Sequence, residues 1–490
     1  MSEFSFFWHD YETFGRVPRR DRPSQFAGVR TDAELNEIGT AVMQFCRPSP
    51  DYLPDPESCL LTGILPQQCL AQGLPEPAFA EVIERELARP GTVGVGYNTI
   101  RFDDEVTRHL FWRNLMDPYA REYKNDCGRW DLLDTVRCMY ALRPDGLNWP
   151  RHEDGRPSFK LEHLTAANGL AHEAAHDALS DVRATVALAR LVRQHQPRLW
   201  EFCLKLRQKQ AVWAEIEAAQ RQGRPFLHVS GMYGPERGCI AAVWPLAPHP
   251  TNKNELIVWD LAEDPAELFG LNAAAIRERM FTRTEDLPEG VTRLPLKTIH
   301  INKSPVVISS LKTLSAPMAE RWGIDMARVD RHADACAKQG PTMAGIWPDV
   351  FSRPAAERSP DVDEDLYGGF INPTDRQRLD RLRKLGPDDP GWTRASFEDR
   401  RLDELVFRYR ARNHPESLDA AERERWGRHC AERLHDGAGG GLSLAAFFEK
   451  LDVLAEAADE RGQEILGALY DYAEQIAPEH LPDDEANAVI

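Results

Sequence analysis

The sequence predicts an α/β domain at the N-terminus, followed by a small β-rich domain and an α-helical domain. Apolar runs typical of strands are interleaved with helical periodicity up to about residue 198, whereas short runs between turn residues dominate 205–350. Prolines and acidic residues at 353–365 predict a linker, and helical periodicity dominates the remainder. A chain of 490 residues is too long for one ordinary core, which agrees with this division. The expected domains are 1–198, 199–352 and 353–477, followed by an acidic tail at 478–490.

The N-terminal part combines strands with amphipathic helices, which is the pattern of an α/β domain. The uniformly apolar run at 92–98 predicts a buried strand, and an Arg- and Pro-rich loop is expected between the two strands that precede it. Behind Asp103, the apolar residues Val106, Leu110 and Leu115 recur at helical spacing. The strands are expected at 4–10, 37–46 and 92–98, and the helices at 78–88, from 103 onward, at 129–141 and at 175–194.

The middle and C-terminal parts differ in their periodicity. Four apolar or alternating runs predict the strands of the middle domain, at 226–229, 239–244, 256–259 and 296–301. Four helical segments are then expected up to about residue 476, interrupted by the Gly-rich loop 437–441. That loop lacks the Lys-Ser/Thr of a phosphate-binding loop, so we expect a flexible connection.

The composition is that of a folded soluble protein, with 42% hydrophobic and 28% charged residues and a formal net charge of −18. This acidity does not exclude nucleic acid as a partner, because binding needs only a local basic groove. Arg16, Arg19, Arg20 and Arg22 could supply part of such a groove or could form a solvated loop, and the sequence supports both interpretations equally.

Cysteine usage and hydropathy indicate the compartment. The nine cysteines include no Cys-x-x-Cys, which is typical of reduced thiols in a cytosolic protein. The N-terminal apolar run is short and broken by Ser5, unlike a signal peptide. No segment approaches the roughly 20 apolar residues of a membrane span. We therefore expect a cytoplasmic protein.

The first candidate site lies almost at the start of the chain, where an apolar run leads into Asp10 and Glu12. Alternate residues of a strand point the same way, so the two carboxylates are expected on one side, about 6–7 Å apart along the strand. Oxygen ligands at such a spacing suit hard cations. By itself the Asp-x-Glu pattern is weak, because it usually marks a solvated strand end.

Two further acids and one histidine are candidates by their context. Asp103 follows a buried strand and begins a helix, so it lies at the carboxyl end of a strand, where α/β active sites occur; its alternative role is a helix N-cap. His176 lies near a helix start, and Asp181 follows a little over one turn later. Three other acids could approach this site but are better explained as helix caps or surface residues, namely Asp131, Asp134 and Asp177.

The four acids and the histidine together indicate one reaction class. Carboxylates that converge in one cleft repel one another unless cations neutralise them. Two divalent ions about 3.5–4 Å apart would do so and would stabilise the attacking and leaving oxygens of a phosphodiester. A histidine beside them could take a proton from the attacking water. The sequence therefore predicts metal-assisted phosphodiester hydrolysis.

The order Asp-x-Glu, Asp, His-x4-Asp resembles the His-containing branch of the DEDD exonuclease superfamily. Longer motifs resemble the bacterial exodeoxyribonuclease I family, and they cover nearly the whole chain. These motifs are FWHDYETFG at 7–15, DRPSQFA at 21–27, GYN at 96–98, RFDDE at 101–105, SFKLEHL at 158–164, HVSGM at 228–232, HINK at 300–303 and YRARN at 409–413.

The resemblance implies a processive 3′→5′ exonuclease that acts on single-stranded DNA in repair and recombination, releasing nucleoside 5′-monophosphates. It implies a ribonuclease-H-like domain, a small β-barrel-like domain and a helical domain that together enclose the strand. It also implies two Mg²⁺ ions, with Mn²⁺ able to substitute. The implied partner is single-stranded-DNA-binding protein, docked through its acidic C-terminal tail, and the implied state is a monomer.

The resemblance also assigns roles to individual residues. The metal ligands are Asp10, Glu12, Asp103 and Asp181, and the general base is His176. Lys160 occupies a position that is commonly arginine in the family, which keeps the charge but loses the bidentate fork. The residues expected to bind substrate are Glu12, Lys160, Arg108, Tyr119, Tyr123, Arg137 and Arg143. Cations suit phosphates and aromatic rings suit unpaired bases, although ordinary surface roles would explain each residue singly.

Three alternatives follow from the same sequence. His172-Glu173-Ala174-Ala175-His176 matches the helix of a zinc metalloprotease, with Glu201 as a conceivable third ligand. That interpretation leaves the other acids unexplained, so we regard the match as coincidental. A related nuclease core also occurs in exoribonucleases and proofreading subunits, which are usually smaller. A scaffolding protein with an inactive nuclease fold is the third alternative, and the complete set of acids argues against it.

Overall fold

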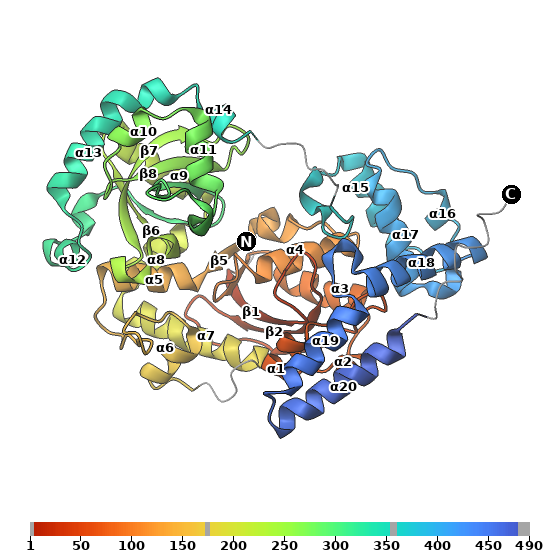
Figure 1. Ribbon diagram of the computed structural model, residues 1–490. Coiled ribbons are helices and arrows are strands. Elements are labelled where there is room, and N and C mark those ends of the chain that lie inside the picture. The colour runs from red at the N-terminus through yellow and green to blue at the C-terminus, as the bar shows by residue number, and fades with distance from the viewer. Residues whose placement is uncertain (1–3, 172–176, 353–359, 479–490) are drawn as a thin grey trace.

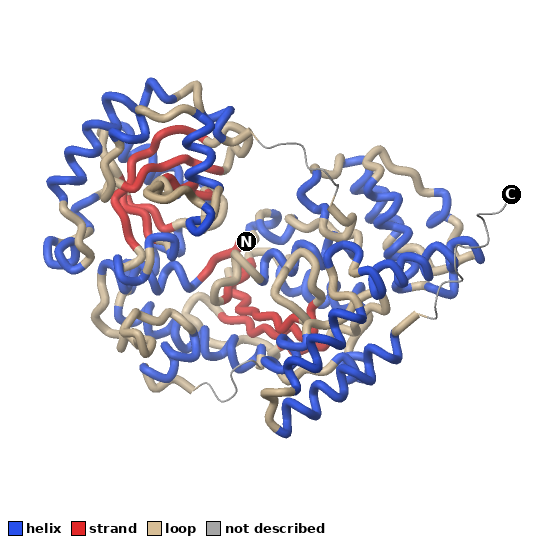
Figure 2. The backbone as a smooth tube through the Cα atoms, viewed as in Figure 1, coloured by secondary structure: helices blue, strands red, loops and turns tan. Residues whose placement is uncertain are grey.

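The computed structural model describes residues 4–171, 177–352 and 360–478. Figure 1 shows an N-terminal domain at the centre, a middle domain built around a second sheet, and C-terminal helices that pack against the N-terminal domain. The strands form two separate sheets, one in each of the first two domains (Figure 2). The predicted order of an α/β, a β-rich and a helical domain is thus confirmed. Within the described ranges, none of the helices has the length and apolar character needed to cross a membrane.

The N-terminal sheet has the strand order β3-β2-β1-β4-β5. Its central strand β1 pairs antiparallel with β2 and parallel with β4, and β4 pairs parallel with β5. Both faces of the sheet carry helices, so the central strands are almost fully buried. The strands are β1 Ser5–Thr13, β2 Pro23–Thr31, β3 Val42–Phe45, β4 Thr92–Gly96 and β5 Gly128–Asp131.

The alternation of side chains along β1 decides which face carries the acids. Phe7 and Tyr11 pack with residues of α3 and α4, whereas Phe6 and Trp8 pack with residues of α5 and α7. Even-numbered residues of β1 therefore face α7. The helices of this domain are α1 Pro56–Thr62, α2 Pro66–Gln72, α3 Glu76–Leu87, α4 Asp103–Arg113, α5 Leu132–Leu142, α6 Leu161–Ala167, α7 Ala178–His195 and α8 Pro197–Lys205.

The middle domain is an antiparallel sheet with the order β10-β6-β7-β8-β9, surrounded by helices. Its buried side chains form one continuous core with those of the N-terminal domain. The strands are β6 Phe226–Val229, β7 Ile240–Pro248, β8 Glu255–Asp260, β9 Leu296–His300 and β10 Val306–Ile308. The helices are α9 Lys209–Arg221, α10 Ala266–Phe269, α11 Ala273–Phe281, α12 Ala316–Arg321, α13 Met326–Gln339 and α14 Trp347–Val350.

The C-terminal helices dock on the N-terminal domain through an apolar core shared with α1 and through buried ion pairs. Arg412 on α17 binds Asp51 at 2.7 Å and also pairs with Asp363, to which Arg22 donates at 3.1 Å. Such buried charges require their partners, so these contacts fix the docking. The helices are α15 Pro373–Leu382, α16 Gly391–Arg394, α17 Arg401–Asn413, α18 Ala420–Asp436, α19 Leu444–Ala455 and α20 Glu460–Ile476.

Several predicted elements differ from the structure. The expected loop between the first two strands contains the fully buried strand β2, and the stretch predicted as one helix at 129–141 begins as strand β5. Strand β2 escaped prediction because it carries Arg30, whose guanidinium is buried through bonds to Ser5, Thr92 and Glu86. The short helices α1 and α2 were also missed, and the C-terminal part holds more helices than the four expected.

Candidate active site

The strand β1 presents two carboxylates toward helix α7. Asp10 and Glu12 lie on the α7 face, and Asp181 lies in the first turn of α7. One carboxylate oxygen from each of the three residues lies within 4.8 Å of the others. The predicted convergence of these acids is therefore present in the structure, although they are far apart in sequence.

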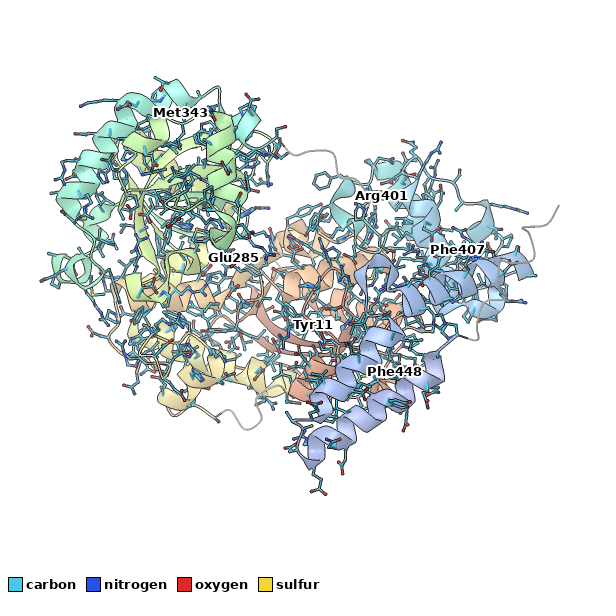
Figure 3. All side chains as sticks on the ribbon, viewed as in Figure 1. Tyr11, Glu285, Met343, Arg401, Phe407 and Phe448 are labelled. Carbon is cyan, nitrogen blue, oxygen red and sulfur yellow. The ribbon has the colours of Figure 1, made fainter. Side chains whose placement is uncertain are left out.

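Asp103 approaches the same place from the end of β4. It is the first residue of α4, and its Oδ1 accepts a hydrogen bond of 3.1 Å from the backbone nitrogen of Tyr11, between Asp10 and Glu12. Tyr11 itself lies within the N-terminal sheet (Figure 3), and its hydroxyl is 2.9 Å from the Oγ1 of Thr107 on α4. The alternative role of Asp103 as an N-cap is wrong, because Phe102 occupies that position and no side chain caps the helix.

The start of α7 is held by two side-chain contacts. Asp177 is its N-cap and accepts from the backbone nitrogen of Ser180 at 3.0 Å. Gln25 lies opposite Glu12 in the β1–β2 register, and its Oε1 accepts from the backbone nitrogen of Ala178 at 3.3 Å. Gln25 thus connects the strand beside Glu12 to the helix that carries Asp181. It was not predicted, and its inclusion in the DRPSQFA motif was the only signal for it.

Burial and mutual repulsion make these acids hard to ionise without cations. Burial, and then repulsion from the neighbouring carboxylates, raises the pKa of Asp10 well above its ordinary value. Burial, followed by the charge of Asp181, raises the pKa of Glu12 to about 8. Burial also raises the pKa of Asp103 to about 8. Oxygen ligands in this electrostatic state fit a site for hard divalent cations.

The neighbouring acid Asp104 has the opposite environment. It is buried, and it accepts hydrogen bonds from Arg121 at 2.6 Å and from Arg129 at 3.0 Å. Although burial alone would raise the pKa of Asp104, the two guanidinium groups hold it below its ordinary range. Asp104 therefore stays charged and fastens the first turn of α4, which also carries Asp103, to the strand β5.

The proposed base His176 lies outside the described residues, as does the whole of the His-Glu-x-x-His pattern that it completes. Of the three acids considered as caps, Asp131 and Asp177 are N-caps of α5 and α7. Asp131 also accepts from the backbone nitrogens of Asn98 and Ile100. Asp134 binds Arg137 instead, at 2.7 Å.

The four cations expected to bind substrate fall into two groups, those paired with other protein groups and one that is exposed. Three are tied to other protein groups: Arg108 binds Glu122 at 2.7 Å, Arg137 binds Asp134, and Arg143 donates to the carbonyl oxygen of Thr313 at 3.2 Å. The other cation, Lys160, is exposed and 3.2 Å from Glu162. Of the Arg-rich loop, Arg22 is buried, Arg20 is paired with Glu364, and Arg16 and Arg19 are exposed.

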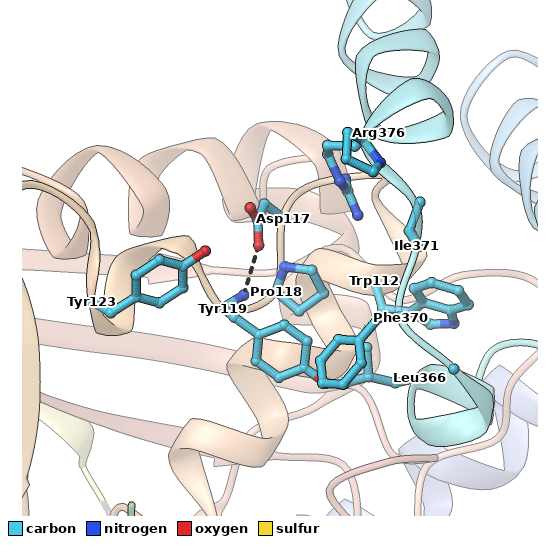
Figure 4. Close-up of a pocket in the computed structure, with 11 residues that line it drawn as sticks. Trp112, Asp117, Pro118, Tyr119, Tyr123, Leu366, Phe370, Ile371 and Arg376 are labelled. Atoms are coloured by element: carbon cyan, nitrogen blue, oxygen red, sulfur yellow. Dashed lines mark hydrogen bonds between the residues drawn. The ribbon is translucent and has the colours of Figure 1, made fainter. Parts of the chain in front are cut away.

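Tyr119 and Tyr123 line an aromatic pocket of about 380 Å³ beside the end of α4 (Figure 4). The opposite wall comes from the C-terminal domain and includes Phe370, whose ring centroid is 6.0 Å from that of Tyr119. Phe370 is 91% exposed, which is unusual for a phenylalanine and leaves its ring free to contact a ligand. The pocket therefore offers exposed rings on two sides.

Family models match all three parts of the chain. A model described as exonuclease matches residues 7–189, one described as the exonuclease I SH3-like domain matches 207–353, and one described as the exonuclease I C-terminal domain matches 360–476. The four candidate metal ligands, Asp10, Glu12, Asp103 and Asp181, all lie within the first match.

Individual proteins match over almost their full length. The chain is 42% identical to exodeoxyribonuclease I of Escherichia coli (strain K12), over 96% of this chain and 98% of that protein. The structure of a moderately thermophilic exonuclease I from Methylocaldum szegediense has a TM-score of 0.91 at 46% identity, covering 97% of this chain and 100% of that one. The zinc-bound form of an Escherichia coli exonuclease I–single-stranded DNA complex has a TM-score of 0.91 at 42% identity, with the same coverage.

Proposed function

The chain belongs to the exodeoxyribonuclease I family, and on this premise we propose that it is a 3′→5′ exodeoxyribonuclease that degrades single-stranded DNA to nucleoside 5′-monophosphates. One observation carries the proposal: Asp10, Glu12 and Asp181 converge, while Asp103 is bound to the backbone between the first two. We propose a role in DNA repair and recombination, in the cytoplasm and as a monomer.

The cofactor that fits this site is a pair of Mg²⁺ ions, with Mn²⁺ able to substitute. Asp10, Glu12, Asp103 and Asp181 would hold them, since all four offer oxygen ligands and repel one another in their absence. When bound, two such ions stabilise the attacking and leaving oxygens of the phosphodiester. His176 would take the proton from the attacking water, and Glu12 would also bind the substrate.

The single-stranded DNA would be held by charged side chains and by stacking on aromatic rings. Lys160 is exposed and could reach a phosphate once it leaves Glu162. Arg108, Arg137 and Arg143 are engaged with protein groups, so they would contribute positive potential or exchange partners on binding. Tyr119 and Tyr123 line a pocket with exposed rings, which suits the stacking of unpaired bases. We also propose that the acidic tail of single-stranded-DNA-binding protein docks on this chain.

The experiment that tests the proposal is digestion of matched single-stranded DNA, duplex DNA and RNA oligonucleotides with Mg²⁺. A label at the 5′ end should give a ladder that shortens from the 3′ end, and the Asp181→Ala variant should leave the strand intact. Preference for RNA would favour an exoribonuclease, and binding without cleavage would favour a scaffolding protein. Zinc-dependent proteolysis without any effect on DNA would favour the protease alternative.

A further inference from the structure

The helix α4 carries a second acid, Glu105, two residues after Asp103. Three groups contact the carboxylate of Glu105, and each comes from a different domain. From its own helix, Arg108 Nη1 donates to Oε1 at 2.8 Å. From the middle domain, Lys303 Nζ lies 3.9 Å from the same oxygen. From the C-terminal domain, the Tyr367 hydroxyl donates to Oε2.

The segment that carries Lys303 is anchored at this place by its neighbours as well. Arg129 Nη2 donates to the carbonyl oxygen of Asn302 at 3.0 Å, and Ser304 Oγ donates to the carbonyl oxygen of Arg129 at 3.4 Å. Arg129 also binds Asp104, the residue that precedes Glu105. The middle domain therefore meets the N-terminal domain at the first turn of α4.

The segment that carries Tyr367 lies along the same helix. The Tyr367 hydroxyl is also 3.1 Å from Arg108 Nη1, and its ring lies edge-on to His109, with the centroids 5.7 Å apart. One turn later, Trp112 Nε1 donates to the carbonyl oxygen of Val362 at 2.8 Å. The C-terminal domain therefore rests on α4 beside the middle domain, with the carboxylate of Glu105 as their common contact.

The contacts of Glu105 with Arg108 and Lys303 are partly shielded from water, whereas Tyr367 is 58% exposed. The side chain of Glu105 is 17% exposed, that of Arg108 is 6% exposed and that of Lys303 is 34% exposed. Charged hydrogen bonds weaken less through solvent screening when they are partly buried. A carboxylate can accept several donors at once, so Glu105 can contact Arg108, Lys303 of the middle domain and Tyr367 of the C-terminal domain at the same time. Movement of either domain away from α4 must break a contact to this one group.

We propose that Glu105 is a positioning residue that locks the middle and C-terminal domains to the helix carrying Asp103, and that this lock retains the DNA strand between successive cleavages. This inference rests on the nuclease function proposed above. The lock acts through Lys303 and Tyr367. Without the carboxylate, Lys303 and Tyr367 lose their shared contact at the first turn of α4, although the apolar cores and the buried ion pairs still hold both domains. The strand therefore escapes more often while hydrolysis of a bound end proceeds as before.

The test separates strand retention from hydrolysis. The number of nucleotides removed per binding event is measured on long 5′-labelled single-stranded DNA, with excess unlabelled DNA as a trap; the rate of a single turnover is measured on a short oligonucleotide. Glu105→Ala should shorten the run length about tenfold, the factor that loss of one charged hydrogen bond gives, with the single-turnover rate unchanged. Glu105→Gln, which keeps an acceptor for Tyr367, should recover part of the run length. Glu217→Gln is the matched control, because its ion pair with Arg221 is exposed on α9, and it should change neither measurement.

A double-mutant cycle tests whether the two domains act through the same carboxylate. Lys303→Met and Tyr367→Phe should each shorten the run length, and in the Glu105→Ala background neither should shorten it further. Effects that persist in that background would overturn the proposal. Equal losses of run length and single-turnover rate, with a lowered melting temperature, would show a merely structural role and would also overturn it. A wild-type protein that fails to cleave the short oligonucleotide would refute the nuclease function itself, and the inference with it.

Discussion

The backbone nitrogen of Tyr11 donates a hydrogen bond to the carboxylate of Asp103, 3.1 Å away. Because Tyr11 lies between Asp10 and Glu12, this bond brings an acid from the end of β4 to the two acids of β1. The side chain of Tyr11 points to the opposite face, where its hydroxyl contacts Thr107 of the same helix. One residue thus fixes α4 against the strand through both its backbone and its side chain.

Two substitutions of Asp103 should separate its structural role from its role in catalysis. Asp103→Asn keeps an acceptor for the Tyr11 nitrogen and replaces a buried acid by a group that cannot ionise, so we expect stability in EDTA equal to or above that of the wild type. Asp103→Ala leaves the buried nitrogen without that acceptor and should destabilise the protein by about 1–3 kcal/mol relative to Asp103→Asn. Both variants should lose nuclease activity. Urea denaturation and oligonucleotide digestion check these expectations, and equal stability of the two variants would refute the structural role.

Removal of divalent cations should lower the stability of the wild-type protein. The carboxylates of Asp10, Glu12 and Asp181 repel one another, and a cation that binds only the folded state stabilises it by about 2.7 kcal/mol at a hundredfold excess over its Kd. The melting temperature should therefore rise with Mg²⁺ concentration. Asp10→Asn relieves part of the repulsion, so this variant should melt higher than the wild type in EDTA and respond less to Mg²⁺. A melting temperature that is independent of Mg²⁺ would contradict the metal site.

Asp104 should matter for stability more than an exposed acid does. Its replacement by Asn removes the ion-pair partner of the buried Arg121 and one of the two partners of Arg129, which keeps Glu122 at 3.3 Å, so we expect a loss of about 3–5 kcal/mol in the free energy of unfolding. The control is Asp117→Asn, because the partner of Asp117, Lys124, is largely exposed, and such a pair contributes at most about 1 kcal/mol. Urea titrations followed by circular dichroism would measure both. Similar losses for the two variants would contradict the interpretation.

The sequence predicted the parts of the site that depend on local periodicity. Asp10 and Glu12 share a face because they alternate along one strand, and Asp181 lies in the first turn of a helix whose apolar stripe was visible. Strand β2 was missed because its short apolar run, from Phe26 to Val29, is flanked by Gln25 and by the buried Arg30. The partners that allow Arg30 to be buried, Ser5, Thr92 and Glu86, come from β1, β4 and α3, and no local pattern reveals them.

The supporting residues of the site depend on contacts between distant segments. Gln25 and Asp104 carry no periodic signal, since their partners Ala178, Arg121 and Arg129 are specified by the assembled sheet. The expectation that Arg108 and Arg137 are free to bind phosphates did not include Glu122 and Asp134, whose positions depend on the fold. Residue types therefore predicted the acids better than the groups that hold them in place.

The buried His228 of the middle domain should make the protein sensitive to mild acid. Its Nδ1 lies 2.8 Å from the Tyr233 hydroxyl, and burial lowers its pKa to about 4. In the unfolded chain, His228 is protonated as the pH falls below about 6.5. In the folded protein it is protonated only near pH 4. The stability present above pH 6.5 is therefore lost as the pH falls toward 4, by up to about 3 kcal/mol. His228→Gln keeps a hydrogen-bonding group and should reduce this dependence, as measured by urea midpoints between pH 5 and 7; the rest of it remains, because burial also lowers the pKa values of His9 and His109. His195→Gln, at an exposed position, should retain the wild-type dependence.

Phe370 should contribute to single-stranded DNA binding if the aromatic pocket holds a base. Its ring is almost fully exposed, faces Tyr119 and belongs to the C-terminal domain, so a base between the two rings would contact both domains. Loss of one stacking contact costs about 1–3 kcal/mol, so Phe370→Ala should weaken binding by roughly 5- to 150-fold. Fluorescence anisotropy with an oligothymidylate, in the Asp181→Ala background to prevent cleavage, would measure the affinity. The control is Phe281→Ala, an exposed phenylalanine of the middle domain away from the pocket, which should bind as tightly as the parent. Equal affinities of the two variants would show that this pocket holds no base.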